Sequence, residues 1–376
     1  MAEPTDPKPF LTQSEAFRDV SRGNPKPHSL KGADAVKARL TPESWRLEIV
    51  ADSSATVGKQ FKLDDNTAID FAAIEALGKK HGVKFLKAMQ CLNIAQPLGQ
   101  GLWEGVPLRE VMRLVGKVKN VRRVFWHGFH NNDPKQIFQS SLGYNQIMET
   151  PPSDLAPFVA YKLNGKPLSL VRGGPVRMII PWAHGFKSIK WLQRITLTND
   201  HKTNDTYADQ NNDPDSYLKT AAYLDSSPEV YKSGEGDAIT LRGTAMVGWS
   251  GLKRVEYWLR PDVGTHGKIE DNDPAWAKAK WEPCTIEPQP ADWSSQLPKD
   301  VSPKDVWGFT AEGKPKEWPM RYSVVPWSVT LKGLKPGAYE FRPRSVDLND
   351  FAQPEPRPYP KSGQNPVQVR TFMVMG

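Results

Sequence analysis

The hydrophobic pattern of the chain changes near residue 225, and this change most limits the folds that it can adopt. After residue 225, apolar and polar residues alternate with the period of two that is typical of strands, over residues 237–248, 253–261, 327–347 and 365–374. A turn rich in glycine and proline divides the third segment into two strands. Helical periodicity is absent there. We therefore expect an immunoglobulin-like β-sandwich over residues 226–376, with a long insertion rich in proline and tryptophan at about 262–325.

The first 225 residues combine helical and strand patterns. The helical patterns cover residues 66–82, with Asn66 or Thr67 as the N-cap, and 106–116, where Pro107 suits the first turn and Gly116 the C-terminal cap. Strand patterns cover residues 44–50, 83–91, 121–128 and 175–182. Because the two kinds do not alternate regularly, we expect an α+β domain over residues 1–225, preceded by an extended polar arm at 1–40.

Composition excludes several classes of function. The net charge of +8 comes from scattered lysines and arginines, so we expect no nucleic-acid binding, although an anion or an acidic partner suits this charge. No run of 18 apolar residues is present, and we expect no membrane span. The first residues lack the pattern of a signal peptide, which fits either a cytoplasmic protein or a chain written without its export signal.

Familiar catalytic motifs are also missing. The glycines of residues 99–105, GQGLWEG, do not have dinucleotide-binding spacing, and residues 248–251, GWSG, do not form a nucleophile elbow. His127 and His130 offer two zinc ligands without an evident third. Cys91 and Cys284 lie far apart, so we expect no disulfide framework. A lone cysteine is most often a small buried apolar residue, and only its surroundings can indicate more.

The surroundings of Cys91 do indicate more. Residues 87–112 read KAMQCLNIAQPLGQGLWEGVPLREVM, and residues 155–198 contain NGKPL, GGPVR and KSIKW in that order. Together these segments resemble the two signatures of the sulfite oxidase family of molybdenum enzymes. Residues 44–50, 344–355 and 363–370 resemble further parts of that family, so the resemblance extends over most of the chain.

The resemblance implies a molybdenum-molybdopterin cofactor with the Cys91 thiolate as the protein ligand of the metal. Soft metals favour thiolate, and the pterin dithiolene supplies the other sulfurs. Lysine and arginine donors suit the anionic pterin phosphate. The residues implied to contact the cofactor are Asn24, His28, Arg172, Arg177, Lys187, Ser188 and Lys190. The residues implied at the substrate are Arg22, Gln96 and Tyr217, with Tyr207 and Tyr223 as rivals of Tyr217.

The chain departs from the family where sulfite would bind. Sulfite oxidases follow the cysteine with AGNRR, whereas LNIAQ here puts neutral Gln96 in place of an arginine. Ser362 stands where a second anion-binding arginine is expected, with Lys361 beside it as a candidate replacement. Each lost charge-assisted hydrogen bond weakens binding by about 1.5–3 kcal/mol. We therefore expect a substrate other than sulfite.

The resemblance implies two-electron oxygen-atom transfer with a small oxyanion or an S- or N-oxide. Because no haem-attachment motif is present, electrons must pass to or from an external carrier, for which a c-type cytochrome is suited. A homodimer through the C-terminal domain is also implied. We expect a periplasmic location if an export signal has been removed from this chain, and a cytoplasmic one otherwise. Two alternatives stay open, namely an S-oxide or N-oxide reductase on the same cofactor and a non-catalytic β-sandwich protein that uses some of the 13 tryptophans to bind a ligand.

Overall fold

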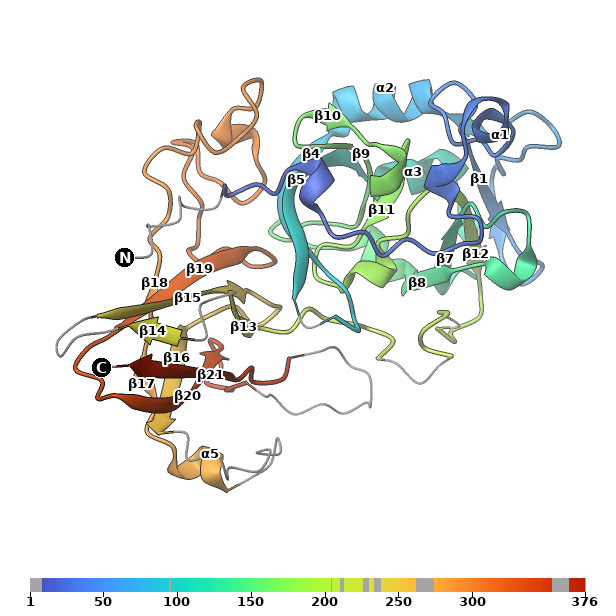
Figure 1. Cartoon of the computed structure of the whole chain (residues 1–376). Coiled ribbons are helices and arrows are strands. Elements are labelled where there is room, and N and C mark those ends of the chain that lie inside the picture. Colours follow the sequence, from blue (N-terminus) through green and yellow to red (C-terminus); the bar gives the residue numbers. More distant parts are fainter. Residues whose placement is uncertain are drawn as a thin grey trace.

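The computed structural model describes residues 9–94, 96–203, 205–209, 213–225, 230–232, 238–261, 274–353 and 365–375 (Figure 1). Within these residues the strands form four sheets of four or five strands each, together with the short pair β2 (Thr56–Val57) and β6 (Val118–Lys119). Two of the large sheets belong to the first half of the chain and two to the second half. The fold is mixed α/β and consists mostly of sheets.

The first half is built on two five-stranded sheets. The first has the order β3 (Ile69–Asp70), β1 (Arg46–Ala51), β12 (Leu192–Thr198), β7 (Arg123–Gly128) and β8 (Gln139–Gly143). The second has the order β10 (Lys166–Pro167), β9 (Phe158–Leu163), β5 (Pro97–Pro107) and β4 (Val83–Gln90), with β11 (Arg177–Ile179) paired to β9. Their apolar faces share one core, to which Leu47, Trp126 and Val159 contribute fully buried side chains. The strands expected at 44–50, 83–91 and 121–128 are confirmed.

The helix expected at 66–82 begins later than its pattern predicts. Helix α2 spans Phe71–His81, because Ile69 and Asp70 pair with β1 as strand β3. The N-cap is Asp70, whose carboxylate accepts a hydrogen bond of 2.9 Å from the backbone N–H of Ala73. Asn66 or Thr67 was therefore the wrong choice of cap.

Strand β5 fills the interval between Cys91 and the helix expected at 106–116, for which no strand was expected from the sequence. It continues to Pro107, so helix α3 spans only Leu108–Met112 before a 3₁₀ turn and Gly116 end the segment. Gly105 permits this arrangement, since a Cβ atom there would lie 2.1 Å from the carbonyl oxygen of Val159 on the neighbouring strand. The strand β11 is also shorter than its predicted range of 175–182. The first half also contains the short helix α4 (Tyr144–Met148).

The second half forms two facing sheets. One has the order β13 (Ala221–Leu224), β15 (Ile239–Met246), β19 (Val324–Leu331) and β18 (Thr285–Ile286). The other has the order β14 (Val230–Lys232), β21 (Arg370–Met375), β20 (Gly337–Val346), β16 (Arg254–Pro261) and β17 (Glu282–Pro283). Leu241, Trp327 and Phe341 from both sheets form their shared core. The predicted strands are present, although residues 365–369 precede β21 without strand structure, and the short helix α5 (Ala275–Lys278) interrupts the insertion.

The insertion packs on the first half of the chain, which the sequence did not indicate. Trp293, Val306 and Phe309 share an apolar cluster with Leu86 of β4 and Leu102 of β5. In Figure 1 the part of the insertion after β18, coloured orange, lies beside β4 and β5, whereas β17 and β18 pair with strands of the second half. The insertion therefore covers the outer side of the strand that leads to Cys91.

The N-terminal arm runs across the first half as an extended segment, as expected (Figure 1). The backbone N–H of Arg18 donates to the carbonyl oxygen of Leu98, and that of Thr12 to Gln100, at 2.9 and 2.8 Å. The arm contains two 3₁₀ turns and ends in helix α1 (Gly32–Lys37). It is thus fixed along β5 before it reaches α1.

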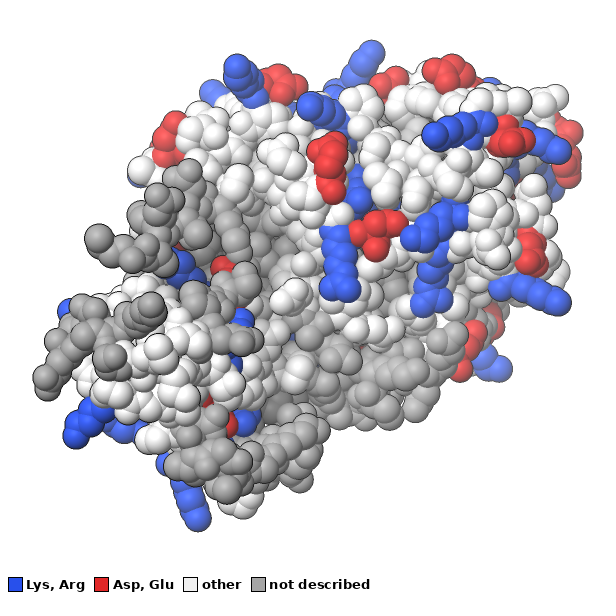
Figure 2. All heavy atoms as spheres, viewed as in Figure 1, with Lys and Arg blue, Asp and Glu red and all other residues white. Residues whose placement is uncertain are grey.

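Charged side chains are dispersed over the face shown in Figure 2, where blue and red groups alternate and no single basic block appears. None of the helices in the described ranges has the length and hydropathy needed to cross a membrane.

The cap of α2 provides a test of this local structure. Asp70→Ala should lower the free energy of unfolding by about 1 kcal/mol, because the first turn loses its acceptor for the Ala73 N–H. Asp70→Asn should keep most of that stability. Urea denaturation of both variants measures the difference, and equal stability of Asp70→Ala and wild type would contradict the cap.

Candidate active site

Strand β4 ends at Gln90, and the next residue, Cys91, lies on the wall of a cavity of about 340 Å³. Side chains two residues apart share one face of a strand, and Met89 lines the same cavity. The Gln90 side chain donates to the carbonyl oxygens of Cys91 and Ile94, which holds the turn after the strand. The fold therefore presents one thiol to an open space.

The other cysteine has a different setting. Cys284 packs against the core of the second half, and burial raises the pKa of its thiol to about 12. Both cysteines are free, as expected from their separation. At neutral pH Cys284 stays protonated, so it is a poor nucleophile and a poor metal ligand.

Six of the eleven residues that the sequence singled out line the Cys91 cavity. They come from the arm, from β4 and from the segment 172–190, and they are Arg22, Cys91, Arg172, Arg177, Ser188 and Lys190. Apolar side chains from several elements complete the wall, including Phe17, Leu98, Trp103, Phe129, Phe138 and Phe186. The fold thus brings together segments that are far apart in sequence.

Two of these residues are arginines buried without carboxylate partners. Arg177 donates to the carbonyl oxygens of Arg172 and Ser188, at 2.8 and 2.6 Å, and its guanidinium lies 5.0 Å from the ring centre of Trp103. Burial lowers the pKa of Arg177 to about 9, and the charge of Arg172 adds to the shift. The Nε atoms of Arg172 and Arg177 are buried and have no hydrogen-bond partner. An anion at this wall would satisfy these donors.

Lys190 adds a third cation. Its ammonium group donates to Asp19, to the hydroxyl of Ser21 and to the carbonyl oxygen of Val171, at 3.1, 2.7 and 2.7 Å. Burial lowers the pKa of Lys190 to about 7, with a further contribution from Arg177 and an opposing one from Asp19. The Ser21 hydrogen bond and the charge of Lys190 hold the pKa of Asp19 well below its usual value, although burial alone would raise it. Asp19 thus pairs with Lys190, and it also pairs with Lys26 at 3.6 Å.

Arg22, which also belongs to the arm, lies between two aromatic rings. Its guanidinium carbon is 4.7 Å from the ring centre of Phe138 and 4.8 Å from that of Tyr207, and it donates to the Tyr207 hydroxyl. Tyr207 was only a rival of Tyr217 in the sequence, and Phe138 gave no signal at all. The tyrosine of this cavity is Tyr207.

Five predicted residues lie elsewhere. Tyr217 pairs with Ala183 and lines a second cavity, with its ring 4.4 Å from that of Trp249. Gln96 and Asn24 are exposed and do not line the Cys91 cavity. His28 stands behind Asp19, with its Nε2 atom 3.9 Å from the carboxylate. Lys361 and Ser362 lie outside the described residues.

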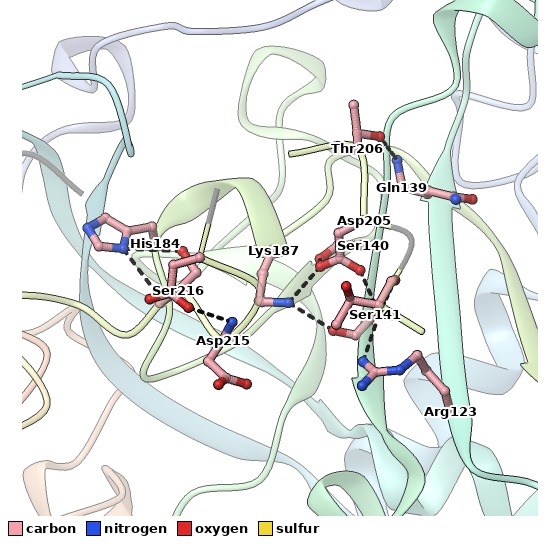
Figure 3. Close-up of polar contacts among 12 residues, drawn as sticks. Arg123, Gln139, Ser140, Ser141, His184, Lys187, Asp205, Thr206, Asp215 and Ser216 are labelled. Atoms are coloured by element: carbon pink, nitrogen blue, oxygen red, sulfur yellow. Dashed lines mark hydrogen bonds and ion pairs between the residues drawn. The ribbon is translucent and has the colours of Figure 1, made fainter. Parts of the chain in front are cut away.

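Lys187 is the fifth residue, and the structure places its side chain away from the cavity rather than on its wall. Its ammonium group is buried in an ion pair with Asp205 at 2.7 Å and also donates to the carbonyl oxygen of Ser141 at 3.0 Å (Figure 3). Asp205 also accepts hydrogen bonds from the hydroxyls of Ser140 and Ser141. Because this pair is fully buried away from the cavity, Lys187 fastens the segment that carries Tyr207 two residues later.

Lys87 is a buried cation that the sequence did not reveal. It lies on β4 and donates to the carbonyl oxygens of Pro181 and Ala183, at 2.6 and 3.2 Å. Burial, with the nearby charge of Arg177, holds its pKa well below the usual value. Alternation along a strand would have placed Lys87 on the face of Cys91, but no local pattern marks a buried lysine.

Comparison with known proteins identifies the domain that carries most of this site. Residues 33–206 match the family model described as oxidoreductase molybdopterin binding domain. These residues therefore form a molybdopterin-binding oxidoreductase domain related to those of sulfite oxidases and nitrate reductases. A nitrate reductase [NADPH] from Beauveria bassiana is 33% identical over 110 residues, which cover 29% of this chain and 12% of the relative. The mitochondrial sulfite oxidase of Drosophila melanogaster is 26% identical over 179 residues, which cover 46% of this chain and 30% of the relative.

These matches leave most of each relative uncovered, since they span less than a third of its length. The sulfane dehydrogenase SoxCD from Paracoccus pantotrophus resembles the whole fold, with a TM-score of 0.58 over 97% of this chain and 89% of that one. Its sequence is 15% identical, so the likeness concerns the fold alone.

The residues present fit molybdopterin, the cofactor of this family. The described residues contain no cluster of three or more histidine, cysteine or carboxylate ligands, so a metal here needs ligands that a cofactor brings, and Cys91 is available to complete them. His127 and His130 therefore form no zinc site with described residues. The surplus of cations and the two unpaired Nε atoms suit the phosphate of the pterin.

Loss of these cations should reduce cofactor content. Arg177→Ala and Lys190→Met each remove a charged donor, which weakens binding by about 1.5–3 kcal/mol. Molybdenum measured in protein from a host that makes the cofactor should fall in both variants. Lys166→Met on the exposed strand β10 is the control and should keep the wild-type content. Full molybdenum content in both cavity variants would show that neither residue holds the cofactor.

The lowered pKa of Lys190 predicts how anion binding to the cofactor-free protein depends on pH. As pH rises through about 7, Lys190 loses its proton in the folded state, so the cavity loses one positive charge. Sulfate keeps its charge over this range, and the thermal stabilisation that it gives should shrink between about pH 6 and pH 8.5.

Without sulfate, the same group has the opposite effect. The unfolded chain binds this proton up to the usual lysine pKa, so the Lys190 contribution to stability increases as pH rises above about 7. In Lys190→Met, neither the sulfate stabilisation nor the stability without sulfate should show these pH dependences. The variant should keep the general stabilisation that sulfate gives because it is excluded from the protein surface. A sulfate effect that does not change with pH in wild type would contradict the assignment.

Proposed function

We propose that the chain is a molybdopterin-dependent oxidoreductase that transfers an oxygen atom to or from a substrate other than sulfite. The observation that carries this proposal is the single cavity in which Cys91 meets Arg172, Arg177 and Lys190. Bound molybdopterin supplies two-electron chemistry, in which the oxidised substrate gains an oxygen atom from water while two electrons and two protons leave.

The residues of the chain have separate tasks in this proposal. The Cys91 thiolate binds the metal, and the buried cations bind the anionic end of the pterin. Arg22 and Tyr207 hold the substrate oxygen by hydrogen bonds, since both lie in the cavity and share one contact. Phe17, Phe129 and Phe138 exclude water and favour a substrate with apolar groups.

Sulfite suits this wall poorly. Gln96 is neutral, exposed and absent from the cavity, so it does not replace the missing arginine. Arg22, which contacts Tyr207, is then the cation at this part of the wall. A single guanidinium between two rings suits a neutral S-oxide or N-oxide better than a dianion. It equally suits the corresponding sulfide or amine.

The remaining parts of the proposal rest on the resemblance of the sequence. Residues 226–376 form an immunoglobulin-like domain that pairs two chains, and residues 1–225 form the catalytic domain. A c-type cytochrome exchanges electrons with the cofactor, and both proteins are periplasmic. The two facing sheets with a shared core support the sandwich architecture of this domain.

Replacement of Cys91 tests the proposal. Cys91→Ser should fold normally and lose turnover with dye electron carriers, because serine is nearly isosteric but is a harder ligand. Cys284→Ser should keep wild-type activity, since its protonated thiol lies in the other core. Full turnover by Cys91→Ser would overturn the role of this residue.

Substrates distinguish the alternatives. Reduced dye with dimethyl sulfoxide or trimethylamine N-oxide measures the reductase direction, and oxidised dye with sulfite measures the sulfite oxidase reaction. We expect turnover of the neutral oxides and weak activity with sulfite. A micromolar KM for sulfite would contradict our placement of the substrate. Absence of molybdenum in purified wild type would instead favour the non-catalytic binding protein.

A further inference from the structure

A second cavity, of about 410 Å³, shares no lining residue with the Cys91 cavity. Three parts of the chain form it. They are helix α4 with the loop after it, the segment around Trp182 and Tyr217, and the turns that carry Trp249, Trp307 and Arg321. Its volume lies within the range of about 300–1,000 Å³ that is usual for ligand pockets. The site and cofactor described above do not use it.

Aromatic rings form most of its apolar wall, contributed by Trp182, Tyr217, Trp249, Trp307 and Tyr322. The rings of Tyr217 and Trp249 lie 4.4 Å apart, and the Trp249 side chain is 48% exposed. Phe85 of β4 packs edge-on against both Trp307 and Tyr322, at 5.6 and 6.3 Å between ring centres. Tyr322 holds its position with a φ of +67°, a conformation that bulky residues rarely adopt. Packing thus fixes several ring faces around a space that solvent can enter.

The charged groups of this cavity are mainly acidic. Glu149, Asp154 and Glu317 line it, and Arg321 is the cation among its lining residues. Arg321 is already paired with Glu317 at 3.1 Å. Among the described residues, Glu149 and Asp154 have no ion-pair partner, although Asp154 accepts a hydrogen bond from Ser153. The charge of Arg321 also acts on Asp154, so three carboxylates face one guanidinium and the lining keeps an excess of negative charge in a chain whose net charge is +8.

The phenols do not add to this negative charge. Burial raises the pKa of Tyr322 to about 12, and the carboxylates of Asp154 and Glu317 add to the shift against the opposing charge of Arg321. Burial also raises the pKa of Tyr217. Both rings stay neutral at physiological pH, so they offer the negative face of a π system beside the excess of carboxylates.

This combination selects one class of ligand. A bare metal ion needs several oxygen ligands around one point, and no metal-binding group of acidic residues occurs in the described part of the chain. An organic cation needs only aromatic faces around its alkyl groups and negative charge nearby. We infer that this cavity binds a small organic cation with a quaternary or tertiary ammonium group. This inference does not depend on the proposed oxidoreductase activity.

Choline is a suitable probe, and 3,3-dimethyl-1-butanol is its neutral counterpart of the same shape. Tryptophan fluorescence of the full holo-protein should change saturably with choline, because three of the rings are indoles. The neutral alcohol should give no saturable change up to about 10 mM, a range that covers affinities weaker than a millimolar Kd. Binding of choline should weaken as salt rises.

Variants test the two parts of the wall separately. Trp249 and Asp154 are both exposed, so replacing them should not disturb the fold. Trp249→Ala and Asp154→Asn should each weaken choline binding by about two- to thirty-fold, the range expected for loss of one cation–π or charge contact. Trp281→Ala removes an indole ring and Glu43→Gln a carboxylate charge outside the cavity, and both variants should bind choline as wild type does. Cys91→Ser should also bind as wild type, which separates this inference from the proposed function.

Three results would overturn the inference. Equal binding of choline and the neutral alcohol would remove the role of charge and favour a neutral ligand such as a sugar. Unchanged affinity in both Trp249→Ala and Asp154→Asn would place the cation elsewhere. Absence of saturable binding by either choline or tetramethylammonium, measured by fluorescence and by calorimetry, would show that the cavity does not take organic cations.

Discussion

Positive charge buried against backbone carbonyl groups, without matching carboxylates, is the constraint on which the first half of this protein depends. Arg177 and Lys87 are both fully buried and both donate to carbonyl oxygens. A carbonyl dipole offsets only part of a full charge, so burial disfavours the charged forms and lowers both pKa values. Of the two, Arg177 lines the Cys91 cavity, so an anion bound there, as we propose for the cofactor, would offset part of this cost.

The site also depends on a segment with little regular structure. The arm supplies Asp19 and Ser21 to Lys190, and it supplies Arg22 to the cavity. Its position is fixed by backbone hydrogen bonds to β5, such as that from Arg18 to Leu98, and by the ion pair of Asp19 with Lys190. The arm and the cofactor-binding segment thus stabilise each other. A change in either is expected to alter both the cavity wall and its charge.

Sequence patterns predicted the parts of this structure that depend on nearby residues. Strands β1 and β4 follow from alternation, and Cys91 from its place at the end of β4. The cap of α2 did not follow, because the run DDNTAID offers several capping residues and the pairing of β3 with β1 decides among them. Lys187 and Lys190 stand three residues apart, yet one meets buried Asp205 and the other lines the cavity. Only long-range packing distinguishes them, and the same holds for Tyr207 and Tyr217.

The distribution of the cavity wall along the chain has a consequence for biosynthesis. The wall begins at Phe17 and ends at Tyr207, so the ribosome releases its first part long before its last. Domains form as their chain emerges, at about 5–20 residues per second. The arm therefore has no complete surface to close on until the segment anchored by Asp205 has appeared. During that interval the thiol and the cationic wall lack the cover that the arm later provides, so they are more open to solvent than in the finished fold.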